Sequence, residues 1–270
     1  MSYEMFRVEV EDRIAFVTFN RPEKANAIPQ KGWEKMKTIF ENLSEDDRVR
    51  VVVLKSTGKH FCAGIDLSLL MSFQQFNQLN CEARKREQFL KSVRHLQACV
   101  NAIETCRKPV IAAIHGGCIG GGVDIVAACD LRYCTDDAYF TIKEVDMGMV
   151  ADLGTLQRLP KIIPFGLASE LAYTGRKMKG AEAKSCGLVN QTYDDQAQML
   201  VGVKSIAATI AAKSPLAIRG TKEVLQYARD HSVQEGLQHI QLWNAAMFLS
   251  SDLMEAFQAG LEKRTPEFED

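Results

Sequence analysis

Three carboxylates lie within ten residues of an otherwise mostly apolar segment, "KEVDMGMVAD" (143–152). They are Glu144, Asp146 and Asp152. Burial raises the pKa of a carboxyl group, because an apolar environment disfavours its charged form. Acids tuned in this way exchange protons near neutral pH, so the segment is a candidate for general acid-base chemistry. A structural alternative is that Asp152, which precedes "LGTLQRL", is the N-cap of a helix.

A glycine-rich segment, "HGGCIGGGVDIVAACD" (115–130), follows the strand pattern "VIAAI" and leads into a helical pattern. It has neither the GxxxxGK[ST] nor the GxGxxG spacing of a nucleotide-phosphate loop. Its exposed backbone amides could instead face a polarised carbonyl oxygen, as in an oxyanion hole. The alternative is close packing of a helix on a strand. Asp124, near the start of this helix, is either an acid of the same site or a residue that complements the helix dipole or caps it.

A second glycine-bearing turn, "KHFCAGIDL" (59–67), follows a strand that ends near Lys55. Its small residues Ala63 and Gly64 leave the backbone accessible to a ligand. Two loops at the ends of core strands can each direct one amide at the same oxygen. Taken alone, such a turn is most often only a connection.

The elements that must position these residues alternate between strand and helix. Two β-rich runs, 6–10 and 13–19, predict a hairpin, and valine-rich or apolar runs predict buried strands at 48–55 and 108–114. Helical patterns cover 31–43 and about 80–105, and helix follows helix after residue 153. We therefore predict an α/β core in residues 1–199 and a helical region in residues 200–270.

Composition limits the partners of this chain. Its 270 residues, 46% of them hydrophobic, are enough for a sizeable core. The 33 basic residues against 34 acidic ones give no general attraction to nucleic acid or to an anionic membrane. The eight cysteines lack CxxC or metal-ligand spacing, so we expect buried thiols in a reducing compartment and no metal.

Targeting signals are not recognisable in the sequence. The N-terminal "MSYEMFRVEV" lacks an apolar signal segment, the C-terminal "EKRTPEFED" is not a Ser-Lys-Leu type signal, and no run of 18 apolar residues predicts a membrane span. These observations predict a cytoplasmic protein if the chain is bacterial. A trimmed eukaryotic chain of the mitochondrial or peroxisomal matrix would look the same.

Three motifs, in this order, resemble the crotonase superfamily, also called the enoyl-CoA hydratase/isomerase family: "HFCAGIDL", "HGGCIGGGVDIVAACDLRYC" and "YFTIKEVDMGMVADLGTLQRLP". The likeness extends from "FNRPEKANAI" to "AFQAGLEKR". It implies an α/β crotonase fold, a spiral of ββα repeats followed by a helical region that packs homotrimers, which often pair into homohexamers. It also implies an acyl-CoA thioester substrate and no separate cofactor, since coenzyme A is part of that substrate.

The resemblance assigns backbone roles to two residues. The N–H groups of Ile65 and Gly121 match the oxyanion-hole donors that hold the thioester oxygen and acidify the hydrogens at C2. Residues that match family contacts to coenzyme A are Lys24, Ala25, Ala63, Asp66 and Lys263. Lys263 matches a lysine near the CoA phosphates, often of a neighbouring subunit, and is otherwise a solvated helix residue.

The acids indicate which reaction of the family to expect. Family hydratases carry glutamates at the positions of Asp124 and Glu144, and usually a glycine at that of Asp152. The set found here resembles the members that isomerise 3,5-dienoyl-CoA to 2,4-dienoyl-CoA. That reaction removes a proton at C2 and adds one at C6, which is too far for one carboxylate to serve both carbons. We assign Glu144 to C2 and Asp152 to C6, with the reverse direction open and Asp124 as an auxiliary acid.

The remaining residues of the segment have structural interpretations. Asp146 and Asp130 match family positions in ion pairs or turns, and Met147, Met149 and Val150 are candidate walls of an acyl pocket. Two other functions stay open. One is 2-enoyl-CoA hydratase, which would use Asp124 in place of the second glutamate and would not need Asp152. The other is a non-catalytic acyl-CoA or RNA-binding protein on the same fold, against which the balanced charge argues.

Overall fold

Six strands form the larger of two sheets in the computed structural model, which describes residues 5–270. Residues 1–4, the start of the segment in which we find no secretion signal, lie outside that range. The strands, in their order across the sheet, are β1 (Phe6–Glu11), β2 (Ile14–Phe19), β3 (Val51–Ser56), β4 (Val110–Ile114), β6 (Leu131–Thr135) and β9 (Gln191–Tyr193). β1 and β2 pair antiparallel and all other pairs are parallel. The predicted hairpin and the two predicted buried strands are confirmed.

A smaller sheet of β5 (Gly117–Ile119), β7 (Tyr139–Thr141) and β8 (Met178–Lys179) was not predicted. Strands of two or three residues are too short to show an alternating pattern. Twice along the chain, a strand of the larger sheet is followed by a strand of the smaller sheet: β4 is followed by β5, and β6 by β7. Helix α4 (Gly121–Ala127) follows β5, so the expected ββα spiral is present.

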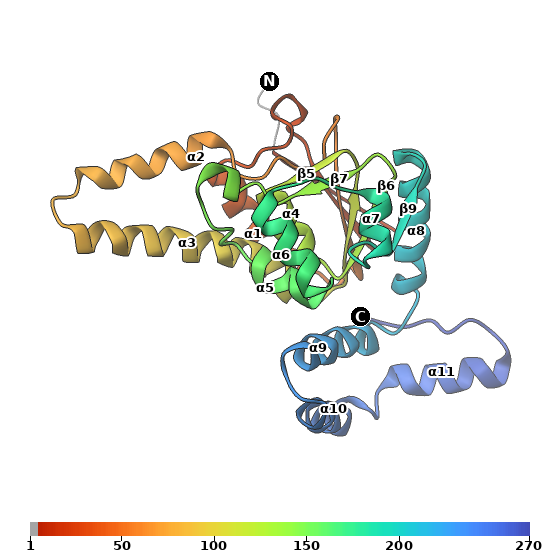
Figure 1. Ribbon diagram of the computed structural model, residues 1–270. Coiled ribbons are helices and arrows are strands. Elements are labelled where there is room, and N and C mark those ends of the chain that lie inside the picture. Colours follow the sequence, from red (N-terminus) through yellow and green to blue (C-terminus); the bar gives the residue numbers. More distant parts are fainter. Residues whose placement is uncertain (1–4) are drawn as a thin grey trace.

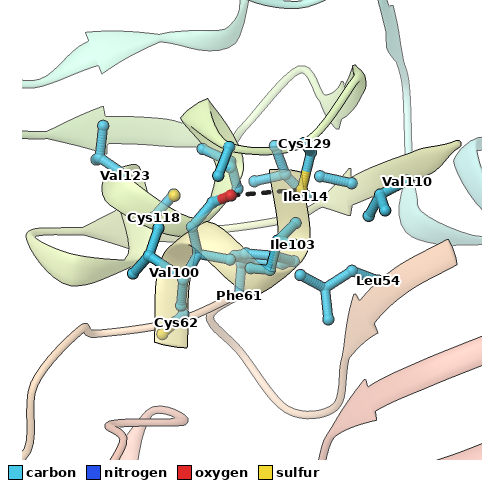
Figure 2. Close-up of a cluster of buried hydrophobic side chains, with 14 of the residues drawn as sticks. Leu54, Phe61, Cys62, Val100, Ile103, Val110, Ile114, Cys118, Val123 and Cys129 are labelled. Carbon is cyan, nitrogen blue, oxygen red and sulfur yellow. Dashed lines mark hydrogen bonds between the residues drawn. The ribbon is translucent and has the colours of Figure 1, made fainter. Parts of the chain in front are cut away.

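Helices cover both faces of the larger sheet. On one face, α1 (Gln30–Glu45) and the long helix α3 (Glu82–Thr105) pack together. Both helices were predicted from the sequence. Figure 2 shows this core, in which Leu54, Phe61, Val100 and Ile103 lie among buried cysteines. On the other face, α8 (Gln196–Ala211) packs its apolar residues against the sheet. The predicted boundary between residues 199 and 200 therefore falls inside a helix that belongs to the core by its packing.

The helices that lie apart from the sheets are α9 (Pro215–Asp230), α10 (Val233–Met247) and α11 (Ser251–Glu262) (Figure 1). Ion pairs tie α9 to the core, with Lys222 Nζ at 2.7 Å from Asp130 Oδ2 and Arg229 Nη1 at 2.5 Å from Glu104 Oε1. Many apolar side chains of this unit are exposed: Leu225, Val233, Leu237, Leu242, Met247, Phe248, Leu249, Met254, Phe257 and Leu261. So many exposed apolar side chains on one unit are typical of an interaction surface.

An arm projects from the spiral (Figure 1). It consists of α2 (Leu67–Ser72), a 3₁₀ turn η2 (Phe73–Gln78) and the first half of α3. The remaining elements are the 3₁₀ turns η1 (Pro22–Lys24), η3 (Val145–Met147) and η4 (Leu159–Lys161), and the helices α5 (Thr155–Arg158), α6 (Phe165–Thr174) and α7 (Gly180–Ser185). Within the described chain no single helix is long and apolar enough to cross a membrane; α8 and α9 reach that length together, across a bend of 106°.

Candidate active site

A cavity of about 720 Å³ opens between the arm and the glycine turns. Its walls include seven of the ten predicted site residues: Lys24, Ala63, Ile65, Asp66, Gly121, Glu144 and Asp152. Met147, Met149 and Val150, predicted as walls of an acyl pocket, line it as well. Asp124, Ala25 and Lys263 do not line the cavity in the described chain. The structure thus brings both candidate proton-transfer acids and both candidate amide donors to one place.

The two glycine turns meet backbone to backbone. Gly64 has a φ of +80°, and a Cβ on it would lie 2.7 Å from both Gly121 N and Ile119 O. A Cβ on Gly122 would lie 2.8 Å from Cys62 O. A side chain at either position would push the turns apart, so the glycines are required for this approach. Close packing and exposure of amides, considered as alternatives from the sequence, are here two aspects of one arrangement.

Two amides at this junction are free. Among residues 5–270, neither the N–H of Ile65 nor that of Gly121 donates a hydrogen bond to the protein. Gly121 opens α4, and the first N–H groups of a helix have no partner within it. Adjacent amides are bound: Gly64 N–H donates to Cys62 Sγ (3.3 Å) and Asp66 N–H to Ile28 O (3.0 Å). Ile65 and Gly121 both line the cavity, so their free amides can donate hydrogen bonds to a ligand oxygen.

Glu144 lies next to the glycine turn. It precedes η3 and is half-buried, and its Oε2 is buried without a hydrogen-bond partner in the described chain. A Cβ on Gly120 would lie 3.0 Å from Glu144 Oε1, so the glycine makes room for the carboxylate. Burial raises the pKa of Glu144, and the charge of Asp152 raises it further. Such a carboxyl group is suited to exchange a proton with a ligand in the cavity.

Asp152 is exposed through the cavity, yet the surrounding protein displaces enough water to raise its pKa. Its backbone carbonyl accepts a hydrogen bond from Gln97 Nε2 at 2.7 Å. The alternative interpretation of Asp152 as a helix cap is wrong. Gly154 stands at the N-cap of α5, and the first amide of that helix, Thr155 N–H, donates to Asp124 instead.

Asp124 lies behind the cavity wall and is only 1% exposed. Its Oδ1 accepts the Thr155 N–H at 2.6 Å, so it binds the first amide of α5 rather than capping its own helix. Burial raises the pKa of Asp124 to about 7; hydrogen bonds from Thr155 oppose the shift, and the charges of Glu144 and Asp152 add to it. The three acids therefore influence one another's protonation.

The predicted contacts to coenzyme A fall into three groups. Lys24 lies at the cavity, and the backbones of Ala25 and Ala63 join the two loops, since Ala63 N–H donates to Ala25 O at 2.9 Å. Asp66 caps α2 through Ser68 N–H and pairs with Arg21 Nη1 at 2.5 Å, which holds the pKa of Asp66 at about 2. Its charge is thus already balanced. Lys263 is the C-cap of α11, in the unit that lies apart from the sheets.

Sequence reasoning missed the part of the wall that comes from α3. Phe89, Val93 and Leu96 line the cavity, and Phe73 of η2 packs its ring edge-to-face on Phe89 with 5.6 Å between centroids. The spacing of the three α3 residues is a helical signal that could have identified this face. Gln97 carries no such signal, because only the fold brings it to Asp152. Within the described chain no three His, Cys, Asp or Glu side chains gather as metal ligands.

Known proteins of one family are similar to the whole chain. A family model described as "Enoyl-CoA hydratase/isomerase" matches residues 9–270, and the chain belongs to that family. The "Delta(3,5)-Delta(2,4)-dienoyl-CoA isomerase, peroxisomal" of Arabidopsis thaliana is 46% identical over 98% of this chain and 96% of its own length. The mitochondrial protein of that name from Mus musculus is 45% identical, over 97% and 81%.

A solved structure supports the same grouping. The enoyl-CoA hydratase of Bacillus anthracis superimposes with a TM-score of 0.87 at 30% identity, covering 98% of this chain and 99% of that one. The expected crotonase fold is confirmed.

Proposed function

We propose that this chain is a Δ3,5-Δ2,4-dienoyl-CoA isomerase, which converts 3,5-dienoyl-CoA to 2,4-dienoyl-CoA in the β-oxidation of unsaturated fatty acids. The observation that carries the proposal is the presence of Asp152 in the same cavity as Glu144 and the two free amides. Relatives of that name, 45–46% identical over nearly the full chain, support it. Hydration does not need an acid at position 152, whereas proton transfer to C6 does.

The first step is loss of the C2 proton. The thioester oxygen accepts hydrogen bonds from the N–H groups of Ile65 and Gly121, and Glu144, charged, takes the proton. The C–H electron pair enters the conjugated system, and the negative charge of the dienolate rests largely on the oxygen. One preorganised donor of this kind typically lowers the barrier by about 3 to 4 kcal/mol.

The second step is protonation at C6. Asp152, neutral at the start, gives its proton to C6, and the double bonds move to positions 2 and 4. Raised pKa values suit both acids to this exchange. Asp124, with a pKa of about 7, is an auxiliary acid that biases which partner holds the proton. The reverse direction uses the same groups, and a proton returns from Glu144 to Asp152 between turnovers.

Coenzyme A enters as part of the substrate, and no other cofactor is required. Lys24, the backbone around Ala25 and Ala63, and Asp66 are proposed to contact its adenine and pantetheine. Lys263 would reach the phosphates of a coenzyme A that is bound to a neighbouring subunit of a homotrimer or homohexamer. The exposed apolar faces of α9, α10 and α11 support such an assembly, because solvent-exposed apolar area of this extent is costly. We propose no nucleic-acid partner.

The compartment follows the source of the chain. Relatives are named peroxisomal and mitochondrial, which supports the matrix of one of those organelles for a eukaryotic protein. A bacterial chain would work in the cytoplasm. The surroundings are reducing in either case, which agrees with eight free cysteines.

The test supplies the purified protein with a 3,5-dienoyl-CoA and, separately, with a 2-enoyl-CoA. We expect the absorbance of a conjugated 2,4-dienoyl thioester to appear with the first substrate, and little loss of the enoyl absorbance with the second. Efficient hydration of the enoyl thioester with no change in the diene would instead assign the chain as a 2-enoyl-CoA hydratase. Binding of both thioesters without turnover would assign a non-catalytic acyl-CoA binding protein.

A further inference from the structure

Helix α3 presents two different faces to the segment that carries Asp152. Phe89, Val93 and Leu96 line the large cavity. Around the helix, the polar side chains of Gln97, Asn101 and Glu104 line a second cavity of about 350 Å³. Leu153 lines both cavities, so the segment around Asp152 is the wall between them.

This wall has no regular secondary structure between residues 149 and 154. Ala151 and Leu153 are buried on one side, and Asp152 is exposed on the other. Gln97 Nε2 donates a hydrogen bond of 2.7 Å to the Asp152 carbonyl. Among the described residues, no other makes a hydrogen bond with Asp152. The position of this acid therefore depends on α3.

The chain after Asp152 is held separately. Asp124 binds Thr155 N–H, and the Arg158 guanidinium donates to Asn101 Oδ1 at 2.8 Å and to Glu104 Oε2 at 2.7 Å. The chain before it is open, with Val150 74% exposed. Gln97 thus binds the chain at Asp152, between the exposed residues before it and the hydrogen-bonded residues after it.

We propose that Gln97 is a positioning residue for the isomerisation. By holding the Asp152 carbonyl it sets the place of the Asp152 carboxyl group opposite Glu144. Glu144 is placed by other elements, η3 and Gly120, so loss of the Gln97 bond moves one acid and leaves the other in place. The inference rests on the proposed function and adds to it a residue that does not touch the reacting atoms.

The test replaces Gln97 by methionine, which has a similar length and no donor. We expect kcat for 3,5-dienoyl-CoA to fall by about tenfold to 100-fold, because a shift of about 1 Å in a reacting group costs that much. KM should stay within about twofold, since substrate binding is not addressed. The rate of deuterium exchange at C2, which uses Glu144, should also stay within about twofold. The matched control is Gln88→Met on the same helix, whose side chain makes no hydrogen bond in the described chain and lines neither cavity.

A mutant cycle separates positioning from general damage. In the Asp152→Asn background, Gln97→Met should cause no further loss of kcat, because Gln97 acts through Asp152. Equal losses in both backgrounds would overturn the proposal, and so would a loss of C2 exchange equal to the loss of kcat.

A readout that does not depend on the reaction is amide hydrogen exchange of residues 149–155. We expect it to be faster in Gln97→Met and unchanged in Gln88→Met. Faster exchange in an enzyme whose native form does not isomerise dienes would uphold the restraint and refute the proposed function. Unchanged exchange in an active isomerase would refute the restraint alone.

Discussion

The two sides of the cavity are built in different ways. On the amide side, the main chain of two turns makes the site, and Gly64 brings the backbone next to Gly121 N. On the acid side, side chains make the site. Glu144 lies against Gly120, and Asp152 belongs to a segment whose backbone accepts a hydrogen bond from Gln97. The amide geometry is therefore a property of local backbone packing, whereas the acid geometry depends on contacts between distant elements.

This difference determines which side of the cavity can accept substitutions. We expect that a carboxyl group on the acid side can change without altering the turns, as at positions 124 and 152, where the resemblance implies a difference from the hydratases of the family. An added atom at the amide side displaces both amides at once. We therefore expect one oxyanion hole to serve several reactions of the family, with the acids selecting among them.

The largest expected effect is that of Glu144→Gln. It should lower both diene isomerisation and C2 deuterium exchange by about 10³-fold to 10⁴-fold, because it removes the base of the first step. Absorbance at the conjugated-diene band and mass spectrometry of the recovered thioester measure the two rates. Retention of C2 exchange would remove Glu144 from the first step.

Asp124→Asn is expected to change the pH dependence of stability. The pKa of Asp124 is about 7 in the folded protein against an ordinary 3.8, so its protonation stabilises the fold fully below pH about 4, and this stabilisation is lost as pH rises through about 7. The native protein should lose free energy of unfolding on the order of 4 kcal/mol across that interval relative to the Asn variant. Urea unfolding at a series of pH values measures this difference, and parallel curves for both proteins would contradict it.

Gly64→Ala tests the amide side. The new Cβ would lie 2.7 Å from Gly121 N at a φ of +80°, so we expect kcat to fall by about 10²-fold to 10³-fold through a distorted oxyanion hole. The matched control is Gly187→Ala: Gly187 has a φ of +85°, the atom nearest to its added Cβ would lie at 3.9 Å, and the residue does not line the cavity. It shares the backbone strain but should keep native kinetics. Equal activity in the two variants would exclude the close approach as a requirement.

The smallest expected effect is that of Asp146→Asn. Asp146 is exposed, pairs with Lys143 and does not line the cavity, so the rate should change less than about twofold. Steady-state kinetics with the dienoyl thioester checks this. A loss comparable to that of Glu144→Gln would mean that the acids of the segment were assigned wrongly.

The sequence predicted the amide side more completely than the acid side, and for a physical reason. Gly64 and Gly120 leave a local signal, because a tight turn with positive φ restricts the residue type at that position. The acids Glu144 and Asp152 were candidates from their apolar segment, and the resemblance gave them separate roles. The partners of the acids were not predicted, since Gln97 reaches Asp152, and Thr155 reaches Asp124, only in the folded chain. Likewise the long helices were predicted, and the two- or three-residue strands of the smaller sheet were not.

The central claim is that two acids divide the proton transfer, and Asp152→Asn tests it most directly. With 3,5-dienoyl-CoA in deuterated water, diene isomerisation and deuterium exchange at C2 are measured on the same sample. We predict that isomerisation falls by about 10³-fold while C2 exchange stays within about twofold of the native rate. Native isomerisation in this variant, or an equal loss of both rates, would contradict the account.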